Sequence, residues 1–223
     1  MRRVPLAFLF LVVAAYAMPA RAGDPYTPGS GVNLELGCYR THFSYPDHLD
    51  DVHACKYGVT YTEPVSEDLS FSMVGGYASL NVDQDPVATQ QDYTGRYLGL
   101  KAGFESYAGD YLNLAAQVSY TWHDVNGAAF QQRSEITWYE TYASLGPVFR
   151  TGPWRFELGG YYQYLDGDEL DEGTVNQRRR FGAYRGNGGY VGVAYFMDQD
   201  ESIALYSTSG ARRGTRIVFQ RYF

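Results

Sequence analysis

The stretch Tyr111 to Val125 reads YLNLAAQVSYTWHDV, and its apolar and polar side chains alternate with a period of two. One alternate set is apolar or aromatic: Leu112, Leu114, Ala116, Val118, Tyr120 and Trp122. The other set is mainly polar: Asn113, Ala115, Gln117, Ser119, Thr121 and His123. This period is typical of a β-strand whose two faces meet different surroundings. A tilted strand that crosses a bilayer needs roughly 9 to 11 residues, about twice the length of an ordinary strand. The stretch therefore favours a transmembrane β-barrel.

The same alternation recurs in ten segments of the chain. They are 32–45, 54–63, 69–82, 93–107, 111–125, 136–150, 154–166, 180–196, 201–208 and 214–223. The connections alternate between short turns at 63–68, 108–110, 151–153 and 197–200 and longer polar loops at 46–53, 83–92, 126–135 and 167–179. We therefore predict an all-β antiparallel barrel with ten strands, short periplasmic turns and longer outer loops. Because the stretch 180–189 is irregular, eight strands remain an alternative.

The N-terminus has the features of a secretory signal peptide. Arg2 and Arg3 precede an apolar run at 6–15, and Ala20-Arg21-Ala22 fits an A-x-A cleavage site. The run is too short for a membrane-spanning helix. We therefore assign residues 1–22 as the signal peptide, 23–31 as a short periplasmic lead, and 32–223 as one barrel domain.

Composition agrees with an exported barrel. The three charged residues of 1–22 are arginines, so the rest of the chain holds 15 of the 18 basic residues and all 25 acidic ones, a formal charge of −10. Nucleic acid is therefore not an expected partner. Aromatic residues make up 17% of the chain, yet the mean hydropathy is negative. This combination suits a barrel, in which half of each strand is polar.

A soluble barrel or sandwich would show the same period, so the content of the polar face decides between the two. Lys101 lies in mid-strand between Gly99 and Gly103, where a soluble core would carry large apolar groups. Aromatic residues near strand ends predict girdles at the membrane interfaces. They are Tyr93, Tyr97, Tyr107, Tyr111, Tyr120, Trp122, Trp138 and Trp154. We favour the membrane barrel.

The polar strand faces predict a lumen with a nearly balanced charge network. Its members are Glu35, Lys56, Lys101, Glu105, Glu140, Arg150, Arg155, Glu157 and Arg216. Four acids and five bases should pair with one another, because unpaired charges in a narrow lumen lose solvation. Bulky side chains share these faces: Tyr97, Tyr107, Trp138, Tyr142, Tyr161 and Tyr222. We therefore predict a lumen filled by side chains, with a narrow pore as an alternative.

Cys38 and Cys55 are the only cysteines of the chain, and export would place them in an oxidising compartment. If the first hairpin pairs residues whose numbers sum to 93, Cys38 faces Cys55 and Leu36 faces Tyr57. One register therefore aligns both the cysteines and the apolar faces. We predict a disulfide between Cys38 and Cys55.

The C-terminal stretch 212–223 resembles the signal by which outer-membrane barrels are recognised for assembly. The positions that fit the signal are Gly214, Ile217, Phe219 and Phe223. Arg221 departs from it, since an apolar residue or tyrosine is usual two places before the end. The chain thus resembles the small Gram-negative outer-membrane β-barrels. The resemblance implies an integral place in the outer membrane, with outer-membrane lipid and lipopolysaccharide as neighbours and the barrel assembly machinery as a partner during biogenesis.

That class includes passive anchors, adhesins, pores, lipid-modifying enzymes and proteases, so the fold alone decides no function. His42-Phe43-Ser44 resembles the His-x-Ser of outer-membrane lipases and lipid A deacylases, whose spacing lets an imidazole activate a hydroxyl. Asp51-Val52-His53 and Asp83-Gln84-Asp85 resemble the omptin proteases, but in the opposite order and without the long strand extensions of those enzymes. We assign no catalytic residue. His42, Ser44 and Asp51 remain weak candidates for a hydrolase acting on lipid or peptide.

Three of the four histidines, His42, His48 and His53, lie close together in the sequence, among Asp47, Asp50 and Asp51. Imidazole and carboxylate groups bind transition metals, but this spacing matches no known tight site. We expect no metal and no other cofactor. The sequence favours a structural or surface-interaction role, with an envelope protein or polysaccharide as a partner whose identity stays open.

Overall fold

The computed structural model describes residues 30–83, 92–107, 112–129, 131–183 and 186–223. The assigned signal peptide at 1–22 and most of the assigned lead lie outside these residues. The described strands are β1 Gly31–Ser44, β2 Leu49–Pro64, β3 Leu69–Asp83, β4 Asp92–Tyr107, β5 Leu112–Ala129, β6 Gln132–Thr151, β7 Trp154–Gly173, β8 Gln177–Ala183, β9 Asn187–Phe196, β10 Glu201–Gly210 and β11 Arg213–Tyr222. Within the described ranges, no helix is long and apolar enough to cross a membrane.

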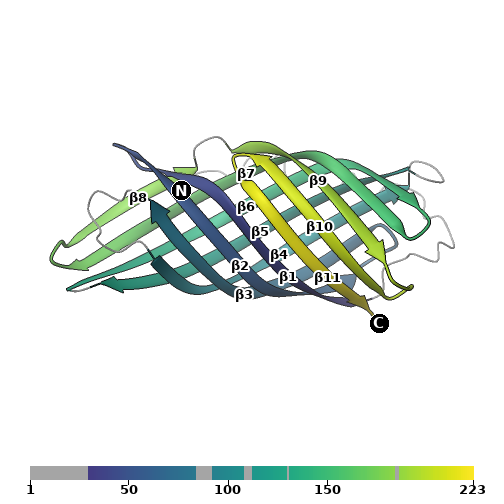
Figure 1. The fold of residues 1–223 in the computed structure, drawn as a ribbon, viewed down its shortest axis with the longest axis horizontal. Coiled ribbons are helices and arrows are strands. Elements are labelled where there is room, and N and C mark those ends of the chain that lie inside the picture. Colours follow the sequence, from purple (N-terminus) through teal and green to yellow (C-terminus); the bar gives the residue numbers. More distant parts are fainter. Residues whose placement is uncertain (1–29, 84–91, 108–111, 130, 184–185) are drawn as a thin grey trace.

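Ten of the described strands form a closed antiparallel ring. The order runs from β1 to β7 and then through β9, β10 and β11, and β11 pairs back to β1 from Gly31–Tyr222 to Arg40–Arg213. Closure gives each strand of the ring two hydrogen-bonded neighbours, which a sheet in lipid requires. The strands cross the molecule obliquely, with the C-terminus at one end and the β5–β6 and β7–β8 hairpins reaching out at the other (Figure 1). The predicted ten-stranded barrel is confirmed.

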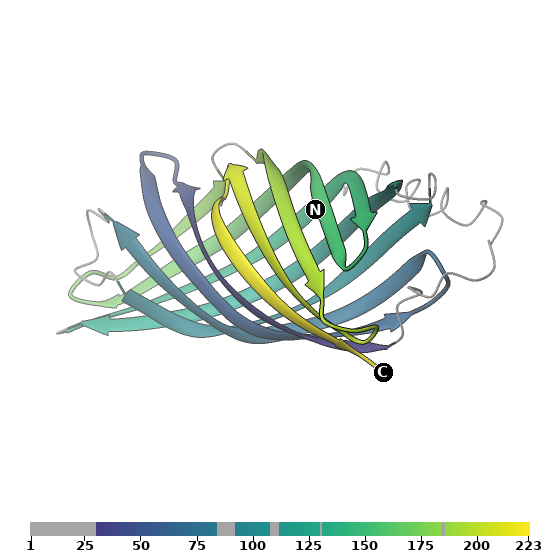
Figure 2. The same cartoon turned by 45° about the vertical axis from the view of Figure 1, so that its right-hand side comes forward.

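The ring changes from ten strands to eight along its axis. We call the end that holds Gly31 and Tyr222 the inner end and the opposite end the outer end. Strand β7 pairs with β9 over residues 154–162, but with β8 over residues 166–171. Strand β8 then pairs with the last residues of β1, Phe43 and Ser44. At the outer end β8 therefore takes the place of β9, β10 and β11, as the two views show (Figures 1 and 2). Because barrel diameter grows with strand number, the barrel narrows outward.

Three connections that we predicted as long loops are largely strand. Residues 49–53 of the predicted loop 46–53 belong to β2. Residues 126–129 and 132–135 continue β5 and β6, and residues 167–173 continue β7. The predicted single strand at 180–196 is divided between β8 and β9. The expectation that the strands reach little beyond the membrane is thus wrong. Cross-strand charged pairs, Arg178–Asp168 at 3.2 Å and Arg180–Asp166 at 3.0 Å, lie on the outward face of the β7–β8 hairpin and support its strand structure there.

The outward side chains of the ten-stranded part form an apolar belt. Members with at least two fifths of their surface exposed include Leu34, Leu36, Tyr57, Val59, Met73, Leu98, Leu100, Leu114, Tyr120, Leu145, Leu158, Tyr162, Val191, Leu205, Ile217 and Phe219. Such a continuous apolar surface is unfavourable in water and is what a bilayer covers. The girdle prediction is wrong for Tyr93, Tyr97 and Trp138, which are buried inside the barrel. Tyr107 and Tyr111 have no described side chain.

Candidate functional site

The inside of the ten-stranded part holds a cavity of about 860 Å³. It extends from the turn residues Glu67, Asp68 and Asp200 at the inner end to Glu140 and Arg212 near mid-barrel. All nine residues of the predicted lumen network line this cavity. The side chains therefore do not fill the lumen at this height, and the prediction of a filled lumen fits only the outer part of the barrel.

The charges nearer the inner end of the cavity pair with one another, mostly across strands. Glu105 accepts hydrogen bonds from Arg150 at 2.9 Å and from Arg155 at 2.7 Å, and Arg155 also donates to Glu157 at 2.7 Å. Arg216 lies 3.4 Å from Glu35. Lys101 lines the same cavity, and among the described residues no acid lies within ion-pair distance of it. The predicted pairing therefore includes eight of the nine charges, once Lys56 and Glu140 are added.

Glu140 is the centre of a buried polar layer at the end of the cavity that points toward the outer end of the barrel. Its carboxylate accepts hydrogen bonds from Lys56 at 2.7 Å, Arg212 at 3.1 Å and Gln163 at 3.1 Å, and 3% of the residue is exposed. The Arg212 guanidinium also lies 3.7 Å from the centre of the Tyr39 ring. The sequence did not reveal Arg212, because it lies in the β10–β11 turn and turn residues carry no alternation that would assign them to a face.

An apolar core closes the barrel between this layer and the outer end. We call it the outer seal, and its members are Tyr39, Phe43, Tyr45, Val52, Ala54, Ala78, Leu80, Val82, Tyr93, Tyr97, Val125, Ile136, Trp138, Leu165 and Phe181. Phe43 stacks on Phe181 with ring centres 4.2 Å apart, and it meets Trp138 edge-on at 5.9 Å. Most of these side chains fill the eight-stranded part, as expected for a barrel of that size, whereas Tyr39 and Tyr97 also line the cavity. Tyr97 packs so closely against Gly58 that a Cβ at this position would clash with the tyrosine hydroxyl oxygen.

A second buried polar cluster lies at the outer end and ties the β1–β2 connection to the β7–β8 hairpin. Tyr45 donates to Glu169 at 2.6 Å, and Arg179 donates to the same carboxylate at 2.9 Å. Ser134 donates to Asp171 at 2.5 Å. Burial and the adjacent Glu169 carboxylate raise the pKa of the Tyr45 hydroxyl well above its usual range. Since Glu169 and Asp171 are each only 1% exposed, this cluster is a fixed part of the outer end.

The weak catalytic candidates lie on the outside of the barrel, beyond the apolar belt. The Nδ1 atom of His42 contacts the carboxylate of Asp51, which is its cross-strand partner. Ser44 lies two residues further along the same face of β1, where it pairs with Gly182 of β8. The structure thus brings His42 and Asp51 together. Residues 84 and 85 of the omptin-like motif lie outside the described residues.

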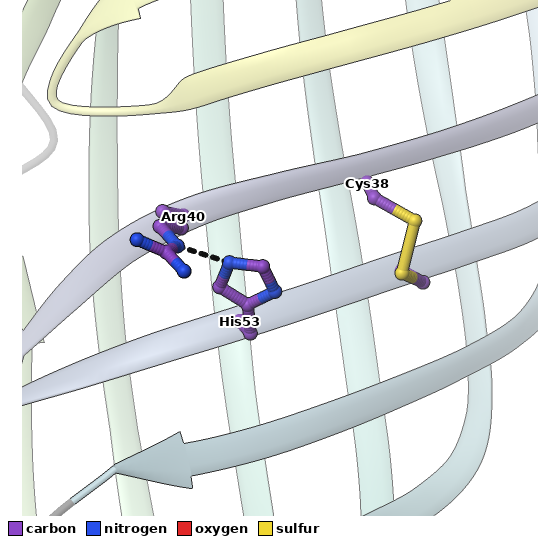
Figure 3. The surroundings of a disulfide bond; sticks show 4 residues. Cys38, Arg40 and His53 are labelled. Atoms are coloured by element: carbon purple, nitrogen blue, oxygen red, sulfur yellow. Dashed lines mark hydrogen bonds between the residues drawn. A yellow bond between two sulfur atoms is a disulfide. The ribbon is translucent and has the colours of Figure 1, made fainter.

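The three histidines suggested as metal ligands have separate partners. His53 accepts a hydrogen bond from Arg40 (Figure 3), whereas His48 lies 2.7 Å from Asp47 and 3.5 Å from Asp50. The hydrogen bond with His48 lowers the pKa of the exposed Asp47 carboxyl. In the part of the chain that the structure describes, no group of three or more His, Cys, Asp or Glu side chains could hold a metal ion.

Cys38 and Cys55 form a disulfide between directly paired residues of β1 and β2, in the register predicted from the sequence (Figure 3). Of the assembly-signal residues, Ile217 and Phe219 belong to the apolar belt on β11, the strand that closes the ring against β1. Gly214 pairs with Tyr39, and the backbone N–H of Phe223 donates to the carbonyl of Ser30 at 2.8 Å. Recognition by the assembly machinery remains a prediction.

Comparisons with known proteins agree with this geometry at the level of fold. No family model matches the chain, and no curated protein matches its sequence. Among solved structures, the fold is similar to the translocator domain of the autotransporter NalP from Neisseria meningitidis. That match has a TM-score of 0.53 and 10% identity and covers 98% of this chain and 95% of the other. The outer membrane protease OmpT from Escherichia coli matches with a TM-score of 0.49 and 11% identity over 91% and 99% of the chains.

The closed ring, the oblique strands and the apolar belt define an outer-membrane β-barrel protein, and its place is the outer membrane. Within that class, this chain is a ten-stranded barrel whose outer end narrows to eight strands and is filled by an apolar core.

Proposed function

We propose that the protein is a non-conducting barrel that displays a rigid, polar β-structure outside the membrane. The outer seal is the observation that supports this proposal. A path for ions would have to cross a core in which Phe43, Trp138 and Phe181 are each at most 3% exposed. An ion in such surroundings loses its hydration and gains no polar partner in return. The cavity below the seal then faces only the inner end.

The polar structure beyond the belt supports a surface role. The β5–β6 and β7–β8 hairpins extend there as paired strands, and the buried Glu169 and Asp171 cluster fixes their inner faces. Their outward faces carry charges of both signs, including Arg133, Glu135, Asp166 and Arg180. An ordered surface loses little conformational entropy on binding, which suits recognition of another envelope or cell-surface molecule.

We expect the purified protein to show no steady conductance in planar bilayers, because the seal blocks the lumen. An open porin inserted under the same conditions provides the positive control. Reproducible single-channel steps whose ion selectivity changes in the Lys101→Glu variant would contradict the proposal, since Lys101 lines the cavity and would then border the conducting path.

The contact between His42 and Asp51 favours a second candidate function, ester hydrolysis of a membrane lipid. A carboxylate on Nδ1 orients an imidazole so that its other nitrogen can take a proton from a serine hydroxyl, and Ser44 lies on the same face. The serine would form an acyl intermediate that water then cleaves. This face meets the outside of the barrel, where lipid is the nearest source of esters.

This candidate predicts that the protein releases fatty acid from lipid A or phospholipid vesicles. The Ser44→Ala and His42→Ala variants should each lower the rate by at least about 10²-fold, because each removes a group that acts in the reaction. His48→Ala is the matched control, since His48 lies in the adjacent turn and pairs with other acids. Absence of release by the unaltered protein, or equal release by the Ser44→Ala variant, would exclude the hydrolase.

A further inference from the structure

Strands β11, β1 and β2 present successive rows of outward side chains just beyond the belt. The last large apolar row consists of Ile217, Leu36 and Tyr57. The next row outward consists of the smaller residues Thr215, Cys38 and Cys55. The third row consists of Arg213, Arg40 and His53. The outward side chains thus change from apolar to basic within three rows, at the outer edge of the apolar belt.

The basic row lacks the acidic partners that other charges of the barrel have. Arg40 and Arg213 are direct cross-strand partners and both are exposed. Arg40 donates a hydrogen bond to the Nε2 atom of His53, which is not an acid (Figure 3). Asp51, the acid one row further outward, contacts His42 instead. Among the described residues, no acid lies within ion-pair distance of Arg40 or Arg213. Like charges placed directly opposite each other destabilise a sheet unless an anion lies between them.

We propose that Arg40, Arg213 and His53 bind the phosphate of an outer-leaflet lipid headgroup. A phosphate accepts several charge-assisted hydrogen bonds, and two guanidinium groups from adjacent strands present donors to it from two sides. The row of small side chains below leaves space for the headgroup, while the acyl chains lie along Leu36 and Ile217 of the belt. The Cys38–Cys55 disulfide joins β1 and β2 directly beneath and fixes the spacing of two of the three donors.

The test compares binding of lipid A with binding of the same lipid after removal of its phosphates, using the purified full chain in detergent and native mass spectrometry. We expect the phosphorylated lipid to bind at least about tenfold more tightly, and the Arg40→Gln/Arg213→Gln variant to lose that preference, because each arginine contributes a charge to the headgroup. The control is Arg178→Gln/Arg180→Gln, which removes two exposed arginines that have acidic partners of their own. It should bind as the unaltered protein does.

Equal binding of the two lipids, or an unchanged preference in the Arg40→Gln/Arg213→Gln variant, would overturn the proposal. If millimolar inorganic phosphate displaces the lipid completely, the site takes free phosphate and the lipid assignment is wrong. Far-ultraviolet circular dichroism and the heat-dependent gel mobility of folded barrels verify that each variant folds. If the double variant does not fold, Arg213→Gln alone is decisive, because Arg213 makes no ion pair within the described part of the chain, and this single variant should still weaken lipid A binding severalfold.

Discussion

Replacing Glu140 by alanine should lower the free energy of unfolding by about 3 to 5 kcal/mol, which is the usual loss when one partner of a buried ion pair is removed. The carboxylate accepts hydrogen bonds from Lys56, Arg212 and Gln163, so its loss leaves two cations without their acid between the cavity and the outer seal. Urea titration of the barrel in lipid vesicles, followed by tryptophan fluorescence, measures the change.

Glu135→Ala is the matched control for this experiment. Glu135 lies on the same strand, β6, but faces outward beyond the belt, so its removal should change the free energy of unfolding by no more than about 0.5 kcal/mol. A double variant separates the effect of charge from the effect of packing. Arg212→Met added to Glu140→Ala removes one of the two cations that have lost their acid, and it should recover part of the lost free energy of unfolding. A Glu140→Ala variant as stable as the control would show that the layer contributes no stability.

The sequence predicted the ten-stranded barrel because the membrane imposes a simple pattern on it. On β5, Leu112 to Trp122 alternate apolar with polar side chains, since one face meets lipid and the other a polar lumen. The same reasoning aligned Cys38 with Cys55, because the apolar positions of β1 and β2 allow one register. The predicted lumen charges face the cavity for the same reason.

The outer end could not be predicted in this way because it is not in lipid. There the outward residues of β7 and β8 include both charged Asp166 and apolar Leu170, and the inward residues include both apolar Phe181 and acidic Glu169, so neither face has a uniform character. Strand structure at this end depends on cross-strand ion pairs and on burial of Phe181 against Phe43. The contact of Phe181 with Phe43 joins β8 to β1, which lie far apart in the sequence, and a local pattern contains no signal of it.

The outer seal leads to the last prediction, which concerns Trp138. Its side chain is 2% exposed, stacks on His123 with ring centres 4.2 Å apart and meets Phe43 edge-on. Trp138→Ala should therefore destabilise the barrel by about 3 to 5 kcal/mol through lost burial and the cavity left behind. Tyr139→Ala, the next residue on β6, is the control, because Tyr139 faces outward with 46% of its surface exposed and its loss opens no internal space. A Trp138→Ala barrel that unfolds at the same urea concentration as the Tyr139→Ala barrel would contradict the packed seal.

Conductance measurements test whether the seal also closes the lumen. The combined Phe43→Ala, Trp138→Ala and Phe181→Ala variant, if folded, should admit ions that the unaltered protein excludes, since water can then enter a core from which three large aromatic side chains are gone.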